Sequence, residues 1–268
     1  MNPVQREYHI FCEGFHDRAF WSGMLVTREW KEAYDKSTKK PAKDPREEVV
    51  KGGRYAFYQG NIAYAEVTPV DGESKILPIA KLRIGDIKGY VEESQKQPNY
   101  VPPTEPKYIV VLSVDDDTLA TENGAALPTL SVQHVKSVLE GLDSQFVVEK
   151  DVFYLFSRSC AVHITRWKAD TPQAAGIPAK QTLERLVCAA ICEAYNTRSE
   201  DVETWLREKS RSPKAYAWSY MAGWYSEHGC DDFYREIWRD ETVRPILEKQ
   251  LKAIGAWAIF DTLSHHTT

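Results

Sequence analysis

The sequence contains no apolar run that approaches the ~20 residues a helix needs to cross a bilayer. It also lacks a signal-peptide pattern, since Arg6 and Glu7 stand directly before the first apolar stretch. The five cysteines are scattered and odd in number, which argues against a disulfide framework. These absences predict a cytoplasmic protein with no membrane partner.

The sequence also has no excess of basic residues over acidic ones. The chain has 34 Lys and Arg against 39 Asp and Glu, for a formal net charge of -5. A protein that coats nucleic acid is usually basic, so this charge argues against non-specific binding as the main role. It argues less against catalysis on nucleic acid, because bound cations offset carboxylates and local basic patches hold phosphates.

Two acidic motifs are the most informative feature that is present. Glu13-Gly14 follows the apolar residues 8–12, and Asp115-Asp116-Asp117 follows the apolar residues 108–113. In open α/β sheets, ligands bind at the carboxyl ends of the strands. A ligand set that consists of carboxylates, without His or Cys, is typical of a hard cation such as Mg²⁺. The pattern therefore predicts a divalent-cation site at the edge of a sheet.

The same residues resemble the Toprim domain, the catalytic module of topoisomerases, bacterial primases and overcoming-lysogenization-defect nucleases. The resemblance rests on Glu13-Gly14, with Asp17 and Phe20 following, and on Asp115-x-Asp117 after a later strand. It implies a Toprim-like α/β fold and Mg²⁺ or Mn²⁺ as the cofactor. It also implies that Glu13, Asp115 and Asp117 are catalytic metal ligands and that Asp17 is a further metal ligand.

Each of these acids has a simpler alternative role. Alternation along a strand puts Asp115 and Asp117 on one side and Asp116 on the other, but aspartates after a strand also cap backbone N–H groups. Glu13 is placed to act as a general base or acid instead of a ligand, or to be stabilised by a helix dipole. Asp17 is equally suited to capping a helix.

The order of elements predicts a mainly parallel sheet with crossover helices and a helical C-terminal portion. Residues 1–170 are expected to form the Toprim-like catalytic domain, with a long insertion at about 30–105, and residues 171–268 a helical region packed on it. The remaining patterns predict a hairpin over 55–69, a strand over 75–82, a short helix over 84–93, a helix capped by Thr129 or Ser131, strands over 146–148, 152–156 and 161–167, and helices from Leu183 and Pro245.

Phosphodiester cleavage also needs a cation near the developing negative charge. Four candidates come from the strands after residue 142, although each is also explained as part of a solvated strand face: Arg158, His163, Arg166 and Lys168. The sequence does not choose among them.

The sequence thus predicts a metal-dependent nuclease, a hydrolase of nucleic-acid phosphodiester bonds, with a role in phage defence. Two alternatives stay open: a toxin or binding subunit that is activated by an ATPase partner, and a nucleotide phosphohydrolase. The choice between DNA and RNA, the number of metal ions and the oligomeric state stay open too. The aromatic segment 216–238 is a candidate surface for a homo-oligomer, or else packs in the helical core.

Overall fold

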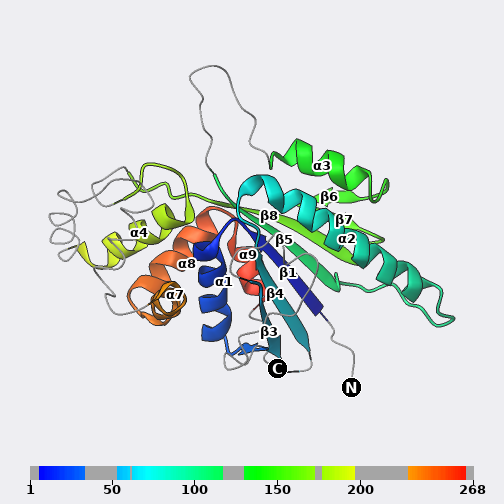
Figure 1. Ribbon diagram of the computed structural model, residues 1–268, viewed down its shortest axis with the longest axis horizontal. Helices are drawn as coiled ribbons and strands as arrows, with labels where there is room; N and C mark the ends of the chain where they lie inside the picture. Colours follow the sequence, from blue (N-terminus) through cyan, green and yellow to red (C-terminus); the bar gives the residue numbers. More distant parts are fainter. Residues whose placement is uncertain are drawn as a thin grey trace, which may run out of the picture. The chain divides into compact units, whose positions relative to one another are not determined.

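The strands in the described part of the chain form one mixed sheet (Figure 1). The computed structural model describes residues 6–33, 53–60, 62–116, 130–172, 177–196 and 229–263. The strands are β1 (Arg6–Cys12), β2 (Lys31–Glu32), β3 (Tyr55–Gln59), β4 (Ala63–Pro69), β5 (Tyr108–Asp115), β6 (Val147–Glu149), β7 (Val152–Leu155) and β8 (Cys160–Trp167). The helices are α1 (Phe15–Thr27), α2 (Glu73–Gln95), α3 (Val132–Glu140), α4 (Leu183–Ala194), α7 (Cys230–Arg239), α8 (Val243–Ala253) and α9 (Trp257–Thr262).

The sheet has the order β2-β3-β4-β1-β5-β8-β7-β6. β1 runs parallel to both of its neighbours, β4 and β5. β8 runs in the same direction as β5, because Tyr108 N donates to Ser159 O where the two strands begin and Asp116 N donates to Trp167 O where they end. The outer pairs β2–β3, β3–β4, β6–β7 and β7–β8 are antiparallel. The expected α/β fold is confirmed, but parallel pairing is confined to the four central strands.

The chain divides into two compact units. The sheet unit comprises Met1–Gly14, Trp30–Val114 and Ala126–Thr165, and the helical unit comprises Phe15–Glu29, Asp115–Ala125 and Arg166–Thr268. The stretch expected as an insertion at about 30–105 supplies β4, which is the parallel neighbour of β1, and α2. It therefore contributes to the centre of the sheet unit.

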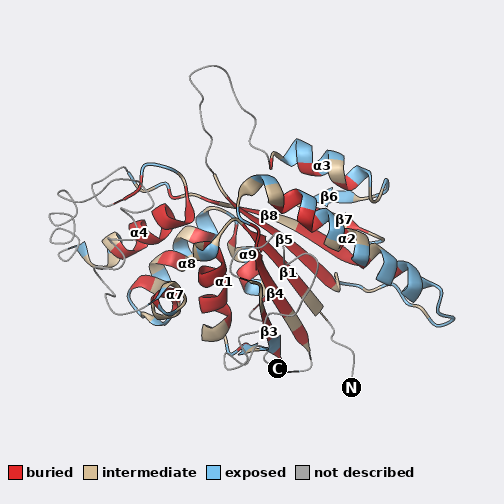
Figure 2. Cartoon of the chain, in the orientation of Figure 1, coloured by how far each residue is buried: buried red, intermediate tan, exposed pale blue. Residues whose placement is uncertain are grey.

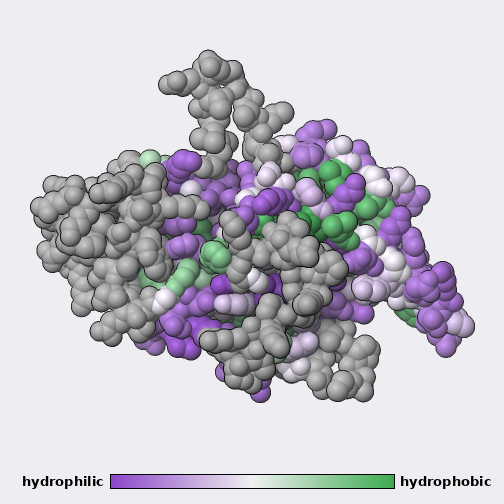
Figure 3. Space-filling view, in the orientation of Figure 1, coloured by the Kyte–Doolittle hydropathy of each residue, from purple (hydrophilic) through white to green (hydrophobic). Residues whose placement is uncertain are grey.

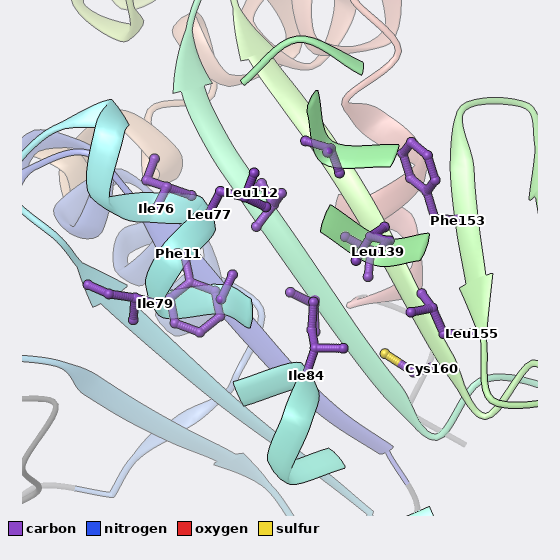
Figure 4. Close-up of a cluster of buried hydrophobic side chains, with 14 of the residues drawn as sticks. Phe11, Ile76, Leu77, Ile79, Ile84, Leu112, Leu139, Phe153, Leu155 and Cys160 are labelled. Atoms are coloured by element: carbon purple, nitrogen blue, oxygen red, sulfur yellow. The ribbon is translucent and has the colours of Figure 1, made fainter. Parts of the chain in front are cut away.

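The core of the sheet unit lies between the sheet and helices α2 and α3 (Figure 4). Phe11 and Leu112 meet Ile76, Ile84 and other apolar residues of α2 there. The central strands are buried along most of their length, whereas β6 and the outer side of α3 are exposed (Figure 2). Hydrophobic surface gathers around α2 and α3 on the face drawn in Figure 3, and the far end of α2 is hydrophilic.

Helix α2 corrects the expectation for residues 75–93. A strand over 75–82 followed by a short helix is wrong, since one helix runs from Glu73 to Gln95 with Pro78 inside it. Ile76, Ile84 and Ile87 are buried in the core of the sheet unit at helical spacing. Burial of this apolar stripe outweighs the hydrogen bond lost at Pro78.

The helix start expected from a capping residue at Thr129 or Ser131 agrees with the structure. Ser131 precedes α3 and its side chain accepts a hydrogen bond from His134 N, and Thr182 precedes α4 and accepts from Arg185 N. Pro245 lies in the first turn of α8, where its missing N–H costs nothing. None of the helices in these ranges is long and apolar enough to cross a membrane.

The helical unit has an aromatic core. Phe20 of α1 contacts the rings of Trp167, Tyr234, Trp238 and Phe260 at centroid distances of 5.1 to 6.2 Å. Trp238 Nε1 also donates to Phe20 O at 3.0 Å, so the indole nitrogen is satisfied inside this core. The described part of the aromatic segment 216–238 is thus core and not a free surface.

Close packing of α1 on α7 depends on Gly23. A Cβ at this position would lie 2.7 Å from Tyr234 O and 3.0 Å from Arg235 N, both backbone atoms. We expect Gly23→Ala to lower the free energy of unfolding by about 1–3 kcal/mol, because the two helix backbones must separate. The shift of the urea denaturation midpoint, followed by circular dichroism, measures this loss.

Gly89→Ala is the matched control. Gly89 is an exposed residue inside α2, and a Cβ there meets nothing within 4 Å. Alanine should stabilise the helix at this site by about 0.5–1 kcal/mol. A Gly23→Ala variant as stable as the wild type would contradict the close approach of α1 and α7.

Candidate functional site

The strand ends that carry the acidic motifs are neighbours in the sheet. β1 pairs with β5 in parallel, and Cys12 lies opposite Ser113. The four central strands follow the order β4-β1-β5-β8. The chain therefore passes from β1 to β4 on one side of β1 and later to β5 on its other side. The switch point of such a topology lies between β1 and β5, and ligands bind there at the carboxyl ends of the strands.

Glu13 is the first residue after β1. Its backbone carbonyl accepts a hydrogen bond from Gly72 N at 3.0 Å, and the carbonyl of Cys12 accepts one from Val70 N at 2.9 Å. Gly72 has a φ of 119°, a backbone conformation that favours glycine. The turn between β4 and α2 therefore holds the main chain of Glu13. Its contact with Glu13 joins residues that are far apart in the chain.

Asp115 is the last residue of β5 and belongs to the helical unit. Its Oδ1 accepts a hydrogen bond from Leu183 N, the first residue of α4, at 3.0 Å. The carboxylate thus lies at the positive end of a helix, where a negative charge is stabilised. This contact matches the expected alternative in which an aspartate caps backbone N–H groups. It also fixes the position of the carboxylate by a partner 68 residues away.

Asp17 lies in the first turn of α1 and is 6% exposed. Its Oδ1 accepts a hydrogen bond from Trp167 Nε1 at 2.8 Å. The backbone of Trp167 in turn accepts one from Asp116 N at 3.0 Å. Trp167 therefore connects Asp17 to the acidic motif after β5. Sequence reasoning included Trp167 only as a strand residue, although a buried indole N–H needs an acceptor.

The remaining acids of the second motif differ in their surroundings. Asp116 forms an ion pair with Arg166, with 3.9 Å between Oδ1 and Nη1. Asp117 lies outside the described residues. Among the residues that are described, no group of three or more His, Cys, Asp and Glu side chains forms a metal site. The donors at the ends of β1 and β5 are carboxylates, which is the chemistry that suits Mg²⁺ or Mn²⁺.

The four cations proposed from the sequence lie at different places along β8. Arg158 precedes the strand, and its Nη1 and Nη2 donate to the two carboxylate oxygens of Glu149 at 2.7 and 3.0 Å. His163 lies in the middle of the strand and is partly buried. Arg166 and Lys168 lie at the carboxyl end of the strand. Only these last two are at the end of the strand where a ligand would bind.

Burial of His163 produces a testable pH dependence. Desolvation of the charged form lowers the pKa of His163 to about 4, whereas an exposed histidine titrates near 6.5. Between these values the unfolded chain binds more protons at this position than the folded chain, so stability falls as the pH falls. We expect the free energy of unfolding of His163→Gln to decline less between about pH 7 and pH 5, by at most about 1.4 kcal/mol per pH unit.

Urea denaturation at the two pH values measures this difference. His134→Gln, which changes an exposed histidine on α3, is the matched control. Equal acid sensitivity in the wild type and in His163→Gln would show that the imidazole ring is not desolvated in this way.

Comparison with known proteins reveals one structural relationship. No family model and no curated protein match the sequence. Among solved structures, the chain is similar to the crystal structure of hypothetical protein PH0156 from Pyrococcus horikoshii OT3, with a TM-score of 0.63 and 15% sequence identity over 96% of this chain and 99% of that one. At this identity the likeness concerns the fold alone, and it supports the mixed α/β architecture with C-terminal helices.

Proposed function

We propose that the protein is a metal-dependent nuclease that hydrolyses phosphodiester bonds of nucleic acid with Mg²⁺ or Mn²⁺. The observation that carries the proposal is the pairing of β1 with β5, whose carboxyl ends lead directly into Glu13 and into Asp115. In this topology the ends of these two strands form the usual ligand site. Acidic residues there are suited to a hard cation.

Glu13, Asp115 and Asp117 are the proposed ligands, with Asp17 as a further one. When bound, the metal lowers the pKa of a coordinated water and stabilises the charge that develops on the phosphate. The residues of the chain orient the ligands. The Leu183 N–H holds one oxygen of Asp115, and the Trp167 indole holds one oxygen of Asp17. Hydrogen bonds of this kind fix the orientation of ligating carboxylates.

Arg166 is the cation we propose for the phosphate. It lies at the carboxyl end of β8 and forms an ion pair with Asp116, next to the proposed ligand Asp115. Arginine suits this task because its planar guanidinium donates several hydrogen bonds to phosphate oxygens. Arg158 is less suited, because it is paired with Glu149 at the start of the strand.

The cellular setting is also part of the proposal. A role in phage defence in the cytoplasm, beside an ATPase partner, rests on the Toprim resemblance of the acidic motifs. The proposed chemistry does not require the partner, so the isolated chain is the right material for a first test.

Asp115→Asn separates catalysis from folding. The side-chain amide oxygen of asparagine still accepts the hydrogen bond from Leu183 N, but the negative charge is lost. Removing a metal ligand should lower the rate by more than the roughly 10- to 100-fold loss typical of residues that only orient ligands. The assay is cleavage of plasmid, single-stranded DNA and bulk RNA by the purified chain with Mg²⁺ or Mn²⁺.

Two further variants make the test specific. Glu13→Gln should abolish cleavage in the same way, whereas Glu140→Gln, which changes an exposed carboxylate on α3, should retain it. Circular dichroism checks that each variant is folded. Cleavage that survives Asp115→Asn would move the site elsewhere, and a wild type that cuts none of the three substrates would contradict the nuclease.

A further inference from the structure

The strand β6 forms one edge of the sheet and is exposed along its whole length (Figure 2). Within the described residues it pairs only with β7, so its outer backbone N–H and C=O groups have no strand beside them. The opposite edge, β2, carries Lys31 and Glu32, and charged side chains are a common protection of an edge strand. β6 instead begins with Val147 and Val148, which are 47% and 44% exposed. An apolar edge of this kind is a template for a further strand.

The hairpin that carries β6 presents this edge in a fixed form. Lys150 and Asp151 connect β6 to β7 with φ values of 49° and 65°, which are typical of the tight turn that matches the twist of two paired strands. The carboxylate of Glu149 accepts hydrogen bonds from Nη1 and Nη2 of Arg158 at 2.7 and 3.0 Å. Its charge is therefore offset by a neighbouring group, and it repels an incoming strand less than a free carboxylate would.

A hollow between α3 and β6 has room for side chains of an added strand. It is a surface cavity of about 520 Å³ whose lining residues are Lys136, Glu140, Ser144, Phe146 and Val148. Val148 lies opposite Phe153 of β7, and Phe153 belongs to the core that α2 and α3 cover. Residues directly opposite each other point to the same face of a sheet, so Val148 points to the side of α3. Hydrophobic surface gathers around this helix in Figure 3.

Two opposite charges line the same cavity. Lys136 and Glu140 are exposed, lie one turn apart on α3, and form no ion pair with the described residues. A two-fold axis through β6, perpendicular to the sheet, makes a second copy of β6 and a second copy of α3 run antiparallel to the first. Lys136 of each copy then lies on the side of Glu140 of the other copy. The surface is therefore complementary to itself, as the interface of a symmetric dimer must be.

From this geometry we propose that β6 is the contact of a homodimer, in which the β6 strands of two copies pair antiparallel and the two sheets become one. Val148 of each copy enters the hollow beside α3, and Lys136 and Glu140 pair across the two-fold axis. Strands of three residues bury little area, so we expect a weak dimer with a dissociation constant in the micromolar range. The inference is independent of the proposed nuclease function, whose residues follow β1 and β5.

Sedimentation velocity of the full chain over a range of concentrations tests the dimer. The average mass of the wild type should rise toward that of two chains as the concentration increases. Val148→Lys should weaken the association about tenfold or more, because Val148 is the central residue of β6 and two like charges then meet across the strands. Val101→Lys is the matched control, since Val101 is a valine of the sheet unit that is 79% exposed, and it should leave the association unchanged.

Reversal of charge identifies the partner as a second copy of this chain. Lys136→Glu and Glu140→Lys should each weaken the homodimer by about fivefold to tenfold, because both symmetry-related pairs become repulsive. A mixture of the two variants should associate again, since one copy then carries two glutamates and the other carries two lysines. Misfolding of either variant cannot produce this recovery, and both residues are exposed.

Three outcomes would overturn the dimer. A wild type that stays monomeric at concentrations on the order of 100 µM would leave the edge to a strand of a different protein. A dimer that persists in Val148→Lys and shows no recovery in the mixture would use another surface. A monomer in which the β6 amides exchange hydrogen slowly would show that another segment of the same chain covers the edge. None of these measurements involves cleavage, so the nuclease is tested separately.

Discussion

The position of β1 between two parallel neighbours is the constraint on which the rest of the sheet depends. Val67 and Val111 lie on either side of Ile10, so both edges of β1 are paired and its side chains are buried on both faces. A parallel neighbour is reached only through a crossover connection. The crossover to β4 and the return to β5 run in opposite directions and leave the end of β1 beside the end of β5. Glu13 owes its place at that edge to this pairing, and the turn at Gly72 holds its backbone.

Three carboxylates of the described residues are each held by fixed hydrogen-bond donors. Asp115 accepts from the start of α4, Asp17 accepts from the indole of Trp167, and Glu66 is surrounded by four donors. Desolvation makes each of these arrangements costly when a partner is lost. Such positions hold a charge in one orientation, which is what recognition of a metal or a phosphate requires. The same arrangement also serves stability, and substitutions that keep the hydrogen bond but change the charge separate the two roles.

The sequence predicted the features that depend on residues close together in the chain. The apolar runs before Glu13 and Asp115 are strands, and Ser131 caps α3 as its side chain suggests. The strand predicted over residues 75–82 is wrong, because Pro78 and the closely spaced apolar residues fit a strand as well as a helix. Packing of the apolar residues against the sheet decides for the helix. The partners of Asp17 and Asp115 were not predictable, because the hydrogen bonds span 150 and 68 residues. The grouping of α1 with the C-terminal helices likewise depends on Phe20 meeting Trp238 and Phe260.

The net charge of -5 and a role on nucleic acid are compatible for a physical reason. Long-range attraction of a polyanion depends on the summed charge, which is unfavourable here. Contact at close range depends on local charge instead, where bound cations offset carboxylates and local basic groups hold phosphates. Binding that relies on a few fixed phosphate contacts has a weaker salt dependence than that of a basic coat protein. The nuclease that we propose therefore relies on contacts at its metal site and not on the summed charge of the chain.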